Sequence, residues 1–466
     1  MSRGADLPPS SPSAPADVSL QRELGLFDST MINVGTIIGS GIFIVPAAVA
    51  GYLHASALVV AAWLIGGVVS LFGALSVAEL GAAMPDAGGM FVYLRRGWGP
   101  IWGYLYGWTN AVVINPASIA AIGIGFATYV GYFVPLSAHG VQGVAMASIA
   151  TLTLINCLGL RQGAVTQNVL TLLKIGAVLG LVAVGFLGAH GGLDRYQPLW
   201  PGAGIAALAG PFGLAMVAVL WAYDGWIEIT YVGSEIRDPG RAIPRSIVAS
   251  IVLVTGIYVL ASLAFIYVLT PAGVARSAAV GADVATAVLG GLGAALIAVA
   301  IAISTLGANN GIIFTAARIP YAMARDAQFF RACARLHPRR RTPVVALVTQ
   351  GIWACLLAGS GTYDQLITYV IFTSFIFYAM AAGAVLRLRR LDPGMERPYR
   401  TWGYPVTPLL FIGFALALVG STILQAPRDA LIGLALVALG LPFYAYLTRR
   451  ARVAAAASPA VAAPSA

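Results

Sequence analysis

Residues Gly35 to Ile42, with the sequence GTIIGSGI, lie in the middle of an apolar run from Phe27 to Tyr52. A run of this length can cross a bilayer as one helix, because about 20 residues at a rise of about 1.5 Å suffice. Three glycines and a serine disfavour a continuous helix, since each glycine costs roughly 0.5–1 kcal/mol relative to alanine. In hydrocarbon, an opened backbone is tolerated only where it is buried in protein or lines a cavity. We therefore expect two half-helices joined by unwound backbone.

The composition of the chain is typical of a membrane protein with many spans. Of its 466 residues, 59% are hydrophobic and 9% are charged, whereas about 25% of the residues in soluble domains are charged. Hydropathy and loop signals predict an all-α membrane protein with twelve spans, at 27–52, 57–83, 98–132, 142–160, 164–188, 206–234, 243–270, 290–320, 343–359, 364–389, 404–424 and 428–448. We expect one transmembrane domain at 25–450, with disordered tails at 1–24 and 451–466.

Basic residues are distributed unevenly between the two sides of this predicted bundle. The formal net charge is +10, and Lys174 is the one lysine among 27 basic residues. All of the arginines except Arg195, Arg276 and Arg428 fall in segments predicted on one side. This asymmetry is the positive-inside pattern, which predicts a multi-pass protein of the cell membrane with both termini in the cytoplasm. Basic and aromatic residues do not interleave, so a nucleic-acid partner is not expected.

The sixth span repeats the anomaly of the first. Its sequence from Ala222 to Trp226, AYDGW, places an aspartate and a glycine inside an apolar helix. The two interrupted spans open two sets of five, at 27–188 and 206–389, followed by two extra helices at 404–448. An odd number of spans in each set inverts the second set, and matching interruptions in two halves are typical of a transport site near the bilayer midplane. A kink that only helps the helices to pack is the alternative.

Lys174 lies about ten residues into the fifth predicted span. A cation at that depth should face protein or water and have partners, because its insertion costs about 2.5–3.5 kcal/mol. Its side chain is too short to reach the nearer interface comfortably, which disfavours simple snorkelling. We expect its ammonium group to bond carbonyls freed by the broken helix. A fixed charge of this kind would take the place of a sodium ion.

Two acidic residues lie in the sixth span. Asp224 pairs with Lys174, carries a proton, or turns its side chain away from the site, and the sequence leaves these alternatives open. Glu228 follows by one turn on the same face, where it pairs with a basic group, accepts a proton or lines a cavity in water. Outside this span, Glu79 is predicted to pair with loop arginines. Asp28 suits a helix N-terminus, where a carboxylate complements the dipole.

The chain shows no signal for a cofactor, a metal centre or an enzyme active site. Its three cysteines, Cys157, Cys333 and Cys355, have neither paired nor metal-ligand spacing. Its four histidines fall in loops or at span ends. No nucleophile–base pair is visible either.

Several motifs resemble those of one large transporter group. Gly35–Phe43 (GTIIGSGIF) and Glu79–Leu94 (ELGAAMPDAGGMFVYL) are similar to the first helix and the second-to-third connection of the amino acid–polyamine–organocation superfamily. Three further motifs resemble the L-type amino acid transporter branch of this superfamily. They are Trp221–Trp226 (WAYDGW), Gly233–Pro244 (GSEIRDPGRAIP) and Glu396–Pro405 (ERPYRTWGYP). The similarity covers about residues 24–450.

This resemblance implies a LeuT-type fold, with two inverted five-helix repeats, broken helices one and six, and two extra helices. It implies alternating access, usually as amino acid exchange. Carried over by position, the backbone amides of Ser40 and Gly41 would bind the substrate carboxylate. The substrate ammonium would be accepted by the carbonyls of Ile37, Trp221 and Asp224.

The resemblance also implies roles for side chains around the two breaks. Trp221 matches the aromatic residue that closes over bound substrate, and Lys174 matches the fifth-helix lysine that replaces sodium. Tyr223 matches the tyrosine of the bacterial AYDGW pattern. The predicted substrate site is completed by Ile38, Gly39, Ala222 and Gly225, with Trp221 and Glu228 as candidates for gating or coupling.

Two departures from animal members affect the expected partners and substrate. Ile227 replaces an asparagine, which leaves the preferred substrate side chain open. The loop at 132–141 lacks the cysteine that joins animal members to a glycoprotein heavy chain. We therefore expect no disulfide-linked partner, and a monomer or weak oligomer in the lipid bilayer.

The sequence thus predicts a sodium-independent transporter or exchanger of neutral L-amino acids. One alternative is a proton-coupled or cationic amino acid or polyamine permease that uses Asp224 or Glu228. Another, from a different class, is a channel or a non-transporting amino acid sensor.

Overall fold

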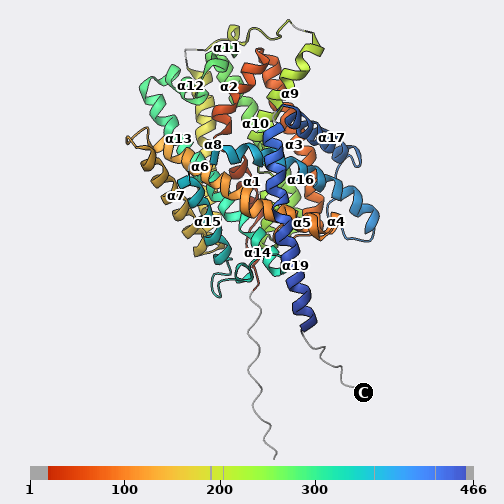
Figure 1. The fold of residues 1–466 in the computed structure, drawn as a ribbon. Helices are drawn as coiled ribbons and strands as arrows, with labels where there is room; N and C mark the ends of the chain where they lie inside the picture. The colour runs from red at the N-terminus through yellow and green to blue at the C-terminus, as the bar shows by residue number, and fades with distance from the viewer. Residues whose placement is uncertain (1–18, 189–190, 203, 361–362, 426, 458–466) are drawn as a thin grey trace, which may run out of the picture.

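The computed structural model describes residues 19–188, 191–202, 204–360, 363–425 and 427–457, which form a bundle of helices (Figure 1). The helices run in chain order as α1 (Leu26–Ile37), α2 (Gly41–Leu53), α3 (Ser56–Ala83), α4 (Met90–Trp98), α5 (Pro100–Thr109), η1 (Asn110–Ile114), α6 (Asn115–Val130), α7 (Ala138–Leu158), α8 (Leu160–Leu187), η2 (Leu193–Tyr196), α9 (Ile205–Ala222), η3 (Glu228–Glu235), α10 (Pro239–Leu269), α11 (Pro271–Arg276), α12 (Val280–Leu289), α13 (Gly291–Ala316), α14 (Arg318–Arg325), η4 (Arg331–Ala334), α15 (Val344–Ser360), α16 (Tyr363–Leu391), α17 (Val406–Gln425), α18 (Pro427–Ala438) and α19 (Gly440–Ala457).

The lengths and apolar character of these helices confirm an all-α membrane protein. Within the described ranges, nine helices are long and apolar enough to cross a bilayer, and the bent pair of α1 and α2 makes ten. Each of the twelve predicted spans coincides with a helix or a run of consecutive helices. Two of them, α9 and α15, are apolar but shorter, so the count of twelve stays a prediction.

The two predicted interruptions are present, and they lie side by side. Helices α1 and α2 meet at a bend of 47°, and α9 gives way after Ala222 to a turn and the 3-10 helix η3. A Cβ atom added at Gly41 would lie 3.2 Å from the Cβ of Ala222, so the breaks are at the same depth. Leu24, before α1, forms a β-bridge with Ile236, after η3. The first span therefore begins at the end of the bundle where the sixth one finishes, which is the arrangement of an inverted repeat.

Helix α3 holds the second break in place by close packing. A Cβ atom added at Gly66 would lie 2.3 Å from Val219 of α9, and one added at Gly67 would lie 2.3 Å from Thr255 of α10. Small residues let membrane helices approach this closely. Both glycines are therefore part of the framework around the site.

The structure differs from the predicted domain limits at both ends. Glu23 and Leu24 belong to the folded domain, because their backbone amides donate to the carbonyl of Glu235. Helix α19 continues to Ala457, beyond the expected limit at residue 450. The parts of the tails at 1–18 and 458–466 lie outside the described residues. The connection between the seventh and eighth predicted spans contains two helices, α11 and α12, at the end opposite α14 and α19 (Figure 1).

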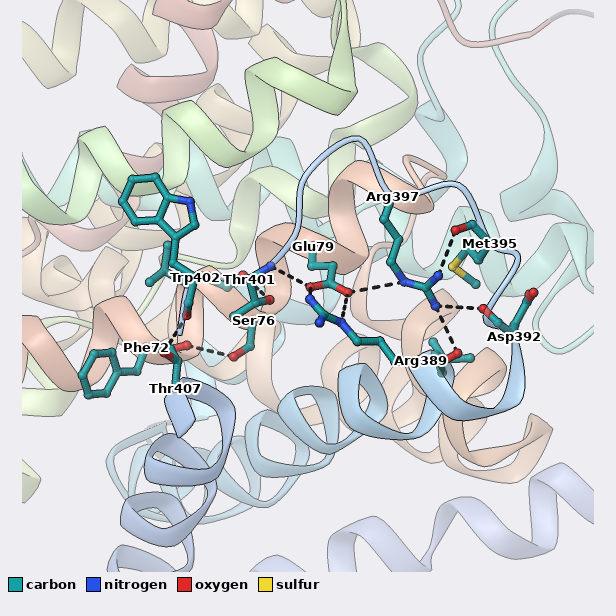
Figure 2. A network of polar contacts seen from close by, with 12 residues as sticks. Phe72, Ser76, Glu79, Arg389, Asp392, Met395, Arg397, Thr401, Trp402 and Thr407 are labelled. Atoms are coloured by element: carbon teal, nitrogen blue, oxygen red, sulfur yellow. Dashed lines mark hydrogen bonds and ion pairs between the residues drawn. The ribbon is translucent and has the colours of Figure 1, made fainter. Parts of the chain in front are cut away.

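Glu79 is the centre of a polar network between α3, α16 and the segment that follows α16, as Figure 2 shows. Its carboxylate accepts hydrogen bonds from Arg389 at 2.8 and 2.6 Å and from the Thr401 amide at 2.7 Å. It also forms an ion pair with Arg397 at 3.4 Å. These contacts confirm the prediction that Glu79 pairs with loop arginines.

Two further contacts close the same end of the bundle. Arg318 and Glu235 form a buried bidentate ion pair with both bonds at 2.9 Å. Asp28 accepts a hydrogen bond at 2.9 Å from the Gly25 amide at the start of α1. The prediction that Asp28 serves a helix N-terminus is therefore confirmed.

Candidate substrate site

The break in the first span exposes backbone carbonyls that other helices then satisfy. The Lys174 ammonium, fully buried on α8, donates to the carbonyls of Gly35 and Ile38, both at 2.7 Å. The Ser304 hydroxyl of α13 donates to the Gly39 carbonyl at 3.0 Å. These contacts place a fixed cation at the negative end of the α1 dipole, where positive charge is favourable.

Glycines make the room that this lysine needs. A Cβ atom added at Gly307 of α13 would lie 2.8 Å from Cε and 3.0 Å from Nζ of Lys174. One added at Gly35 would lie 2.1 Å from the Gln167 amide nitrogen of α8. Helices α1, α8 and α13 therefore meet around Lys174 with no space for larger residues.

The other side of the first break offers hydrogen-bond donors. The first amides of a helix have no intrahelical acceptors. Ser40 occupies the N-cap of α2 but its hydroxyl does not cap these amides. Gly39, Ser40 and Gly41 line a cavity. An anion in that cavity would therefore meet open N–H groups at the positive end of the α2 dipole.

The second break is held against the first by side chains of α1. Gly225 has a φ of +108°, which favours glycine. Its carbonyl accepts a hydrogen bond from the Thr36 hydroxyl at 3.2 Å. Asn33 donates to the Trp226 carbonyl at 3.0 Å and accepts from the Ile229 amide at 3.2 Å.

Tyr258 of α10 joins the two breaks directly. Its buried hydroxyl lies 3.2 Å from the Ile37 carbonyl and 3.0 Å from the Ala222 carbonyl, so one donor serves both. A carbonyl oxygen has two lone pairs, which leaves Ile37 able to accept a second hydrogen bond. Tyr258 therefore sets the distance between the C-terminal ends of α1 and α9.

A cavity of about 140 Å³ lies between the breaks and helices α6, α13 and α16. A buried water needs roughly 10–15 Å³ on this measure, so the space accommodates a small solute. Of the predicted site residues, the lining includes Ile37, Gly39, Ser40, Gly41, Trp221, Ala222, Asp224, Gly225 and Glu228. It does not include Ile38, Lys174 or Tyr223.

The three absent residues lie behind the cavity wall for physical reasons. The carbonyl of Ile38 accepts a hydrogen bond from Lys174, so both residues lie on the side of the break that faces away from the cavity. Tyr223 is fully buried, and its hydroxyl donates to the Trp63 carbonyl at 3.0 Å. In the turn after α9, Tyr223 thus points away from the cavity, whereas its neighbour Asp224 lines it.

The acidic residues of the site have hydroxyl partners. Tyr378 of α16 donates to Asp224 at 2.9 Å, and the Thr315 hydroxyl of α13 donates to Glu228. Lys174 bonds backbone carbonyls, and the expected alternative in which it pairs with Asp224 is wrong. The cavity lining contains these two carboxylates and no lysine, arginine or histidine within the described residues.

The sequence interpretation missed the opposite wall of the cavity. This wall is formed by Asn110, Ile114, Asn115, Ser118, Ile122, Tyr231, Ala308, Ile312 and Tyr378, together with Thr36. Asn115 donates to Asn110 at 2.6 Å where the π-helix η1 leads into α6. Short π-helices occur frequently at functional sites. Two asparagines in an apolar span were a signal that could have identified this wall, because such polar residues usually face the protein interior.

Comparison with known proteins identifies one family and several relatives. The chain matches the amino acid permease family over residues 24–432. It is 31% identical over 437 residues to the serine/threonine exchanger SteT of Bacillus subtilis, with 93% of this chain and 98% of that protein covered. Identity to the human b(0,+)-type amino acid transporter 1 is 33% over 437 residues, covering 92% and 88% of the two chains.

A third relative is the human large neutral amino acids transporter small subunit 2. It is 32% identical over 451 residues, covering 94% of this chain and 83% of that protein. These matches agree with the resemblance that the motifs indicate.

Proposed function

Because this chain belongs to the amino acid permease family, we propose that it is a sodium-independent exchanger of neutral L-amino acids that works by alternating access. Its relatives include proteins named as exchangers and as transporters of neutral amino acids. The observation that carries the proposal is the Lys174 ammonium bonded to the carbonyls of Gly35 and Ile38. An ammonium group at the first break would take the place of a bound sodium ion.

A free amino acid has charges that match the two breaks. Its carboxylate would accept from the amides of Ser40 and Gly41, at the positive end of α2. Its ammonium would donate to the carbonyls of Ile37, Trp221 and Asp224, near the negative ends of α1 and α9. The substrate side chain would then extend toward α6 and α13, whose residues Ser118, Ala308 and Ile312 line the rest of the cavity.

Alternating access requires part of this site to move between two arrangements. Trp221 is the residue before the last one of α9, directly before the break. It lines the cavity and keeps 36% of its surface exposed. Its indole is therefore placed to close over a bound amino acid when α2 and α9 tilt at their breaks. Lys174 and Tyr258 hold the break itself, so the half-helices can tilt while the binding groups stay together.

Uptake of radiolabelled amino acids by proteoliposomes tests this proposal. Uptake of neutral amino acids should be the same with and without a sodium gradient, and amino acid preloaded inside the vesicles should accelerate it strongly. Dependence on sodium would contradict the role of Lys174. An absence of acceleration would indicate a uniporter, and continuous ion current would indicate a channel.

A second candidate function is transport of cationic amino acids. Asp224 and Glu228 favour this function, because both line the cavity and the other described lining residues include no cationic side chain. If it holds, arginine and lysine should compete with a labelled neutral substrate, and Asp224→Asn should abolish the competition by cationic amino acids only. Uptake driven by a pH gradient and lost in Glu228→Gln would instead support proton coupling.

The arginine distribution and the helices together support a multi-pass protein of the cell membrane. We infer cytoplasmic termini from the positive-inside pattern. The loop at 132–141 has no cysteine, and the three cysteines of the chain are unpaired in the structure. The proposal therefore includes no disulfide-linked heavy chain.

A further inference from the structure

Two apolar grooves open on the outer surface of the bundle, away from the substrate cavity. The first, which we call the α19 groove, has a volume of about 480 Å³ and lies between α5 and α19, with Tyr104 and Phe443 on its two walls. The second, the α15 groove, has a volume of about 330 Å³ and is lined on one side by Trp353 of α15. Val112, Phe329 and Phe330 line both grooves.

Aromatic rings line the α19 groove. Some of them stack on one another, and others are exposed on the surface. Trp108 stacks on Phe443 with centroids 4.7 Å apart. Tyr446 is 61% exposed and Phe330 is 71% exposed. Tyr446 lies on a membrane-spanning helix, and Phe330 lies in the segment that follows α14. Exposed rings on the outer surface of a membrane-spanning bundle are accessible to lipid, so an acyl chain is the occupant that fits the grooves. Two grooves with a common wall match the two chains of one diacyl lipid.

A polar group inside the α19 groove lacks a partner. Tyr104 is fully buried and lines this groove. Its hydroxyl has no hydrogen-bond partner among the described residues. An unpaired buried hydroxyl costs about 1–3 kcal/mol. An ester or glycerol oxygen of a lipid would supply the missing acceptor.

Arginines border the grooves at the end that is rich in positive charge. Arg331 directly follows Phe330, and Arg450 lies four residues after Tyr446 on the same face of α19. Both side chains are exposed, and neither forms an ion pair within the described part of the chain. The nearby Asp326 already pairs with Arg95. A negatively charged headgroup would therefore find two free arginines where its acyl chains enter the grooves.

We propose that the α19 and α15 grooves bind one anionic diacyl phospholipid of the surrounding membrane, with its phosphate between Arg331 and Arg450. The acyl chains lie on either side of Phe330, and the Tyr104 hydroxyl donates to an oxygen of the lipid backbone. The site is separate from the substrate cavity, with which it shares no lining residue.

Native mass spectrometry of the purified full chain tests this site. The protein is incubated with phosphatidylglycerol or phosphatidylcholine that carry identical acyl chains. Phosphatidylglycerol should be retained preferentially. The double variant Arg331→Gln/Arg450→Gln should weaken this retention about tenfold to thirtyfold, because each basic residue near an anionic lipid contributes roughly fivefold in affinity. Arg428→Gln, an exposed arginine outside both grooves, is the matched control and should change nothing.

A second variant tests the apolar part of the site. Val112→Trp fills the wall common to both grooves and should reduce retention of phosphatidylglycerol, whereas Leu410→Trp on an exposed surface of α17 should not. Equal retention of the two lipids by the unmodified chain would overturn the proposal. So would equal losses in Arg428→Gln and the double variant, or displacement of the lipid by soluble glycerol phosphate, which would show that the grooves contribute nothing.

Discussion

At the scale of single residues, transport without sodium depends on how Lys174 is held. A buried ammonium is stable only with partners, and here the partners are two backbone carbonyls at a helix end and not a carboxylate. Gly307 and Gly35 keep α13 and α1 close enough for this geometry.

The first prediction concerns the lysine itself. In Lys174→Ala, two carbonyls lose their donor, and an unpaired buried polar group costs about 1–3 kcal/mol. Uptake into proteoliposomes should fall at least about tenfold. Leu173→Ala, at the neighbouring lipid-facing position, should transport normally. Unchanged uptake by a folded Lys174→Ala protein would remove the basis for sodium independence.

The second prediction tests the space around the ammonium group. In Gly307→Ala the added methyl would lie 2.8 Å from Cε of Lys174 and displace it from its carbonyls. Uptake should decrease severalfold while the protein stays folded. Gly291→Ala is a matched control on the same helix, because nothing lies within 4 Å of the added methyl there. Similar uptake by both variants would show that the position of the ammonium does not matter.

The residue-scale predictions from the sequence succeeded where charge made a residue conspicuous. Lys174, Glu79 and Asp28 stand out in apolar surroundings, and their partners are of the expected kind. Tyr223 and Tyr378 could not be placed, because their orientation depends on the helix register and on which helices meet. Tyr223 faces Trp63, whereas Tyr378 reaches Asp224 from a distant helix.

At the scale of elements, the two breaks act as one structure because side chains connect them. Asn33 and Thr36 of α1 bond the backbone of the second break, and Tyr258 bonds a carbonyl from each side. A substrate that binds both breaks is therefore bound by a preorganised pair of helix ends, which reduces the ordering needed on binding.

The third prediction concerns the close approach of the two breaks. In Gly225→Ala, the new residue keeps a φ near +108° and its Cβ lies 3.1 Å from the Thr36 carbonyl carbon. This strain costs about 1–3 kcal/mol, so thermal unfolding in detergent should occur at a lower temperature. Gly213→Ala, in open space on α9, should have little effect. Equal midpoints for the two variants would contradict the described contact.

The fourth prediction isolates the hydroxyl that joins the breaks. Tyr258→Phe keeps the ring packed against Trp63 and Tyr223 but removes the donor to Ile37 and Ala222. The apparent affinity for amino acids should fall about tenfold or less, as expected for one net hydrogen bond of about 0.5–1.5 kcal/mol. Competition uptake measures this change, and an unaltered affinity would mean that Tyr258 does not position the breaks.

Glycine placement predicted both breaks, but not the local geometry that surrounds them. The 3-10 helix η3 and the π-helix η1 lie beside the site, and the local sequence pattern did not distinguish these forms from an ordinary α-helix. The short helices α11 and α12 were missed because their segment lacks the length of a span.

At the scale of the whole molecule, the end of the bundle that is rich in arginine is closed by ion pairs. Glu79, Arg389 and Arg397 join α3 to α16 and the following segment (Figure 2), and Arg318 of α14 pairs with Glu235 of η3. These pairs hold the framework around the two breaks, and the sequence predicted the first of them because Glu79 lies near the end of its span, close to the loop arginines.

The fifth prediction compares a buried ion pair with an exposed one. Glu79→Gln leaves two arginines without their carboxylate, and removing one partner of a buried pair costs about 3–5 kcal/mol. Asp392→Asn breaks the exposed pair with Arg96, which contributes about 0–1 kcal/mol. Thermal unfolding in detergent should therefore separate the two variants clearly. A loss that is no larger in Glu79→Gln would refute the structural role of the network.

The most direct test of the central claim is an experimental structure of the purified protein with the amino acid that competes best for uptake. We predict density in the cavity between the two breaks, with the carboxylate about 3 Å from the amide nitrogens of Ser40 and Gly41. The ammonium should lie at a similar distance from the carbonyl oxygens of Ile37, Trp221 and Asp224. An amino acid bound outside this cavity, or bound inside it with its two ends reversed, would contradict the account.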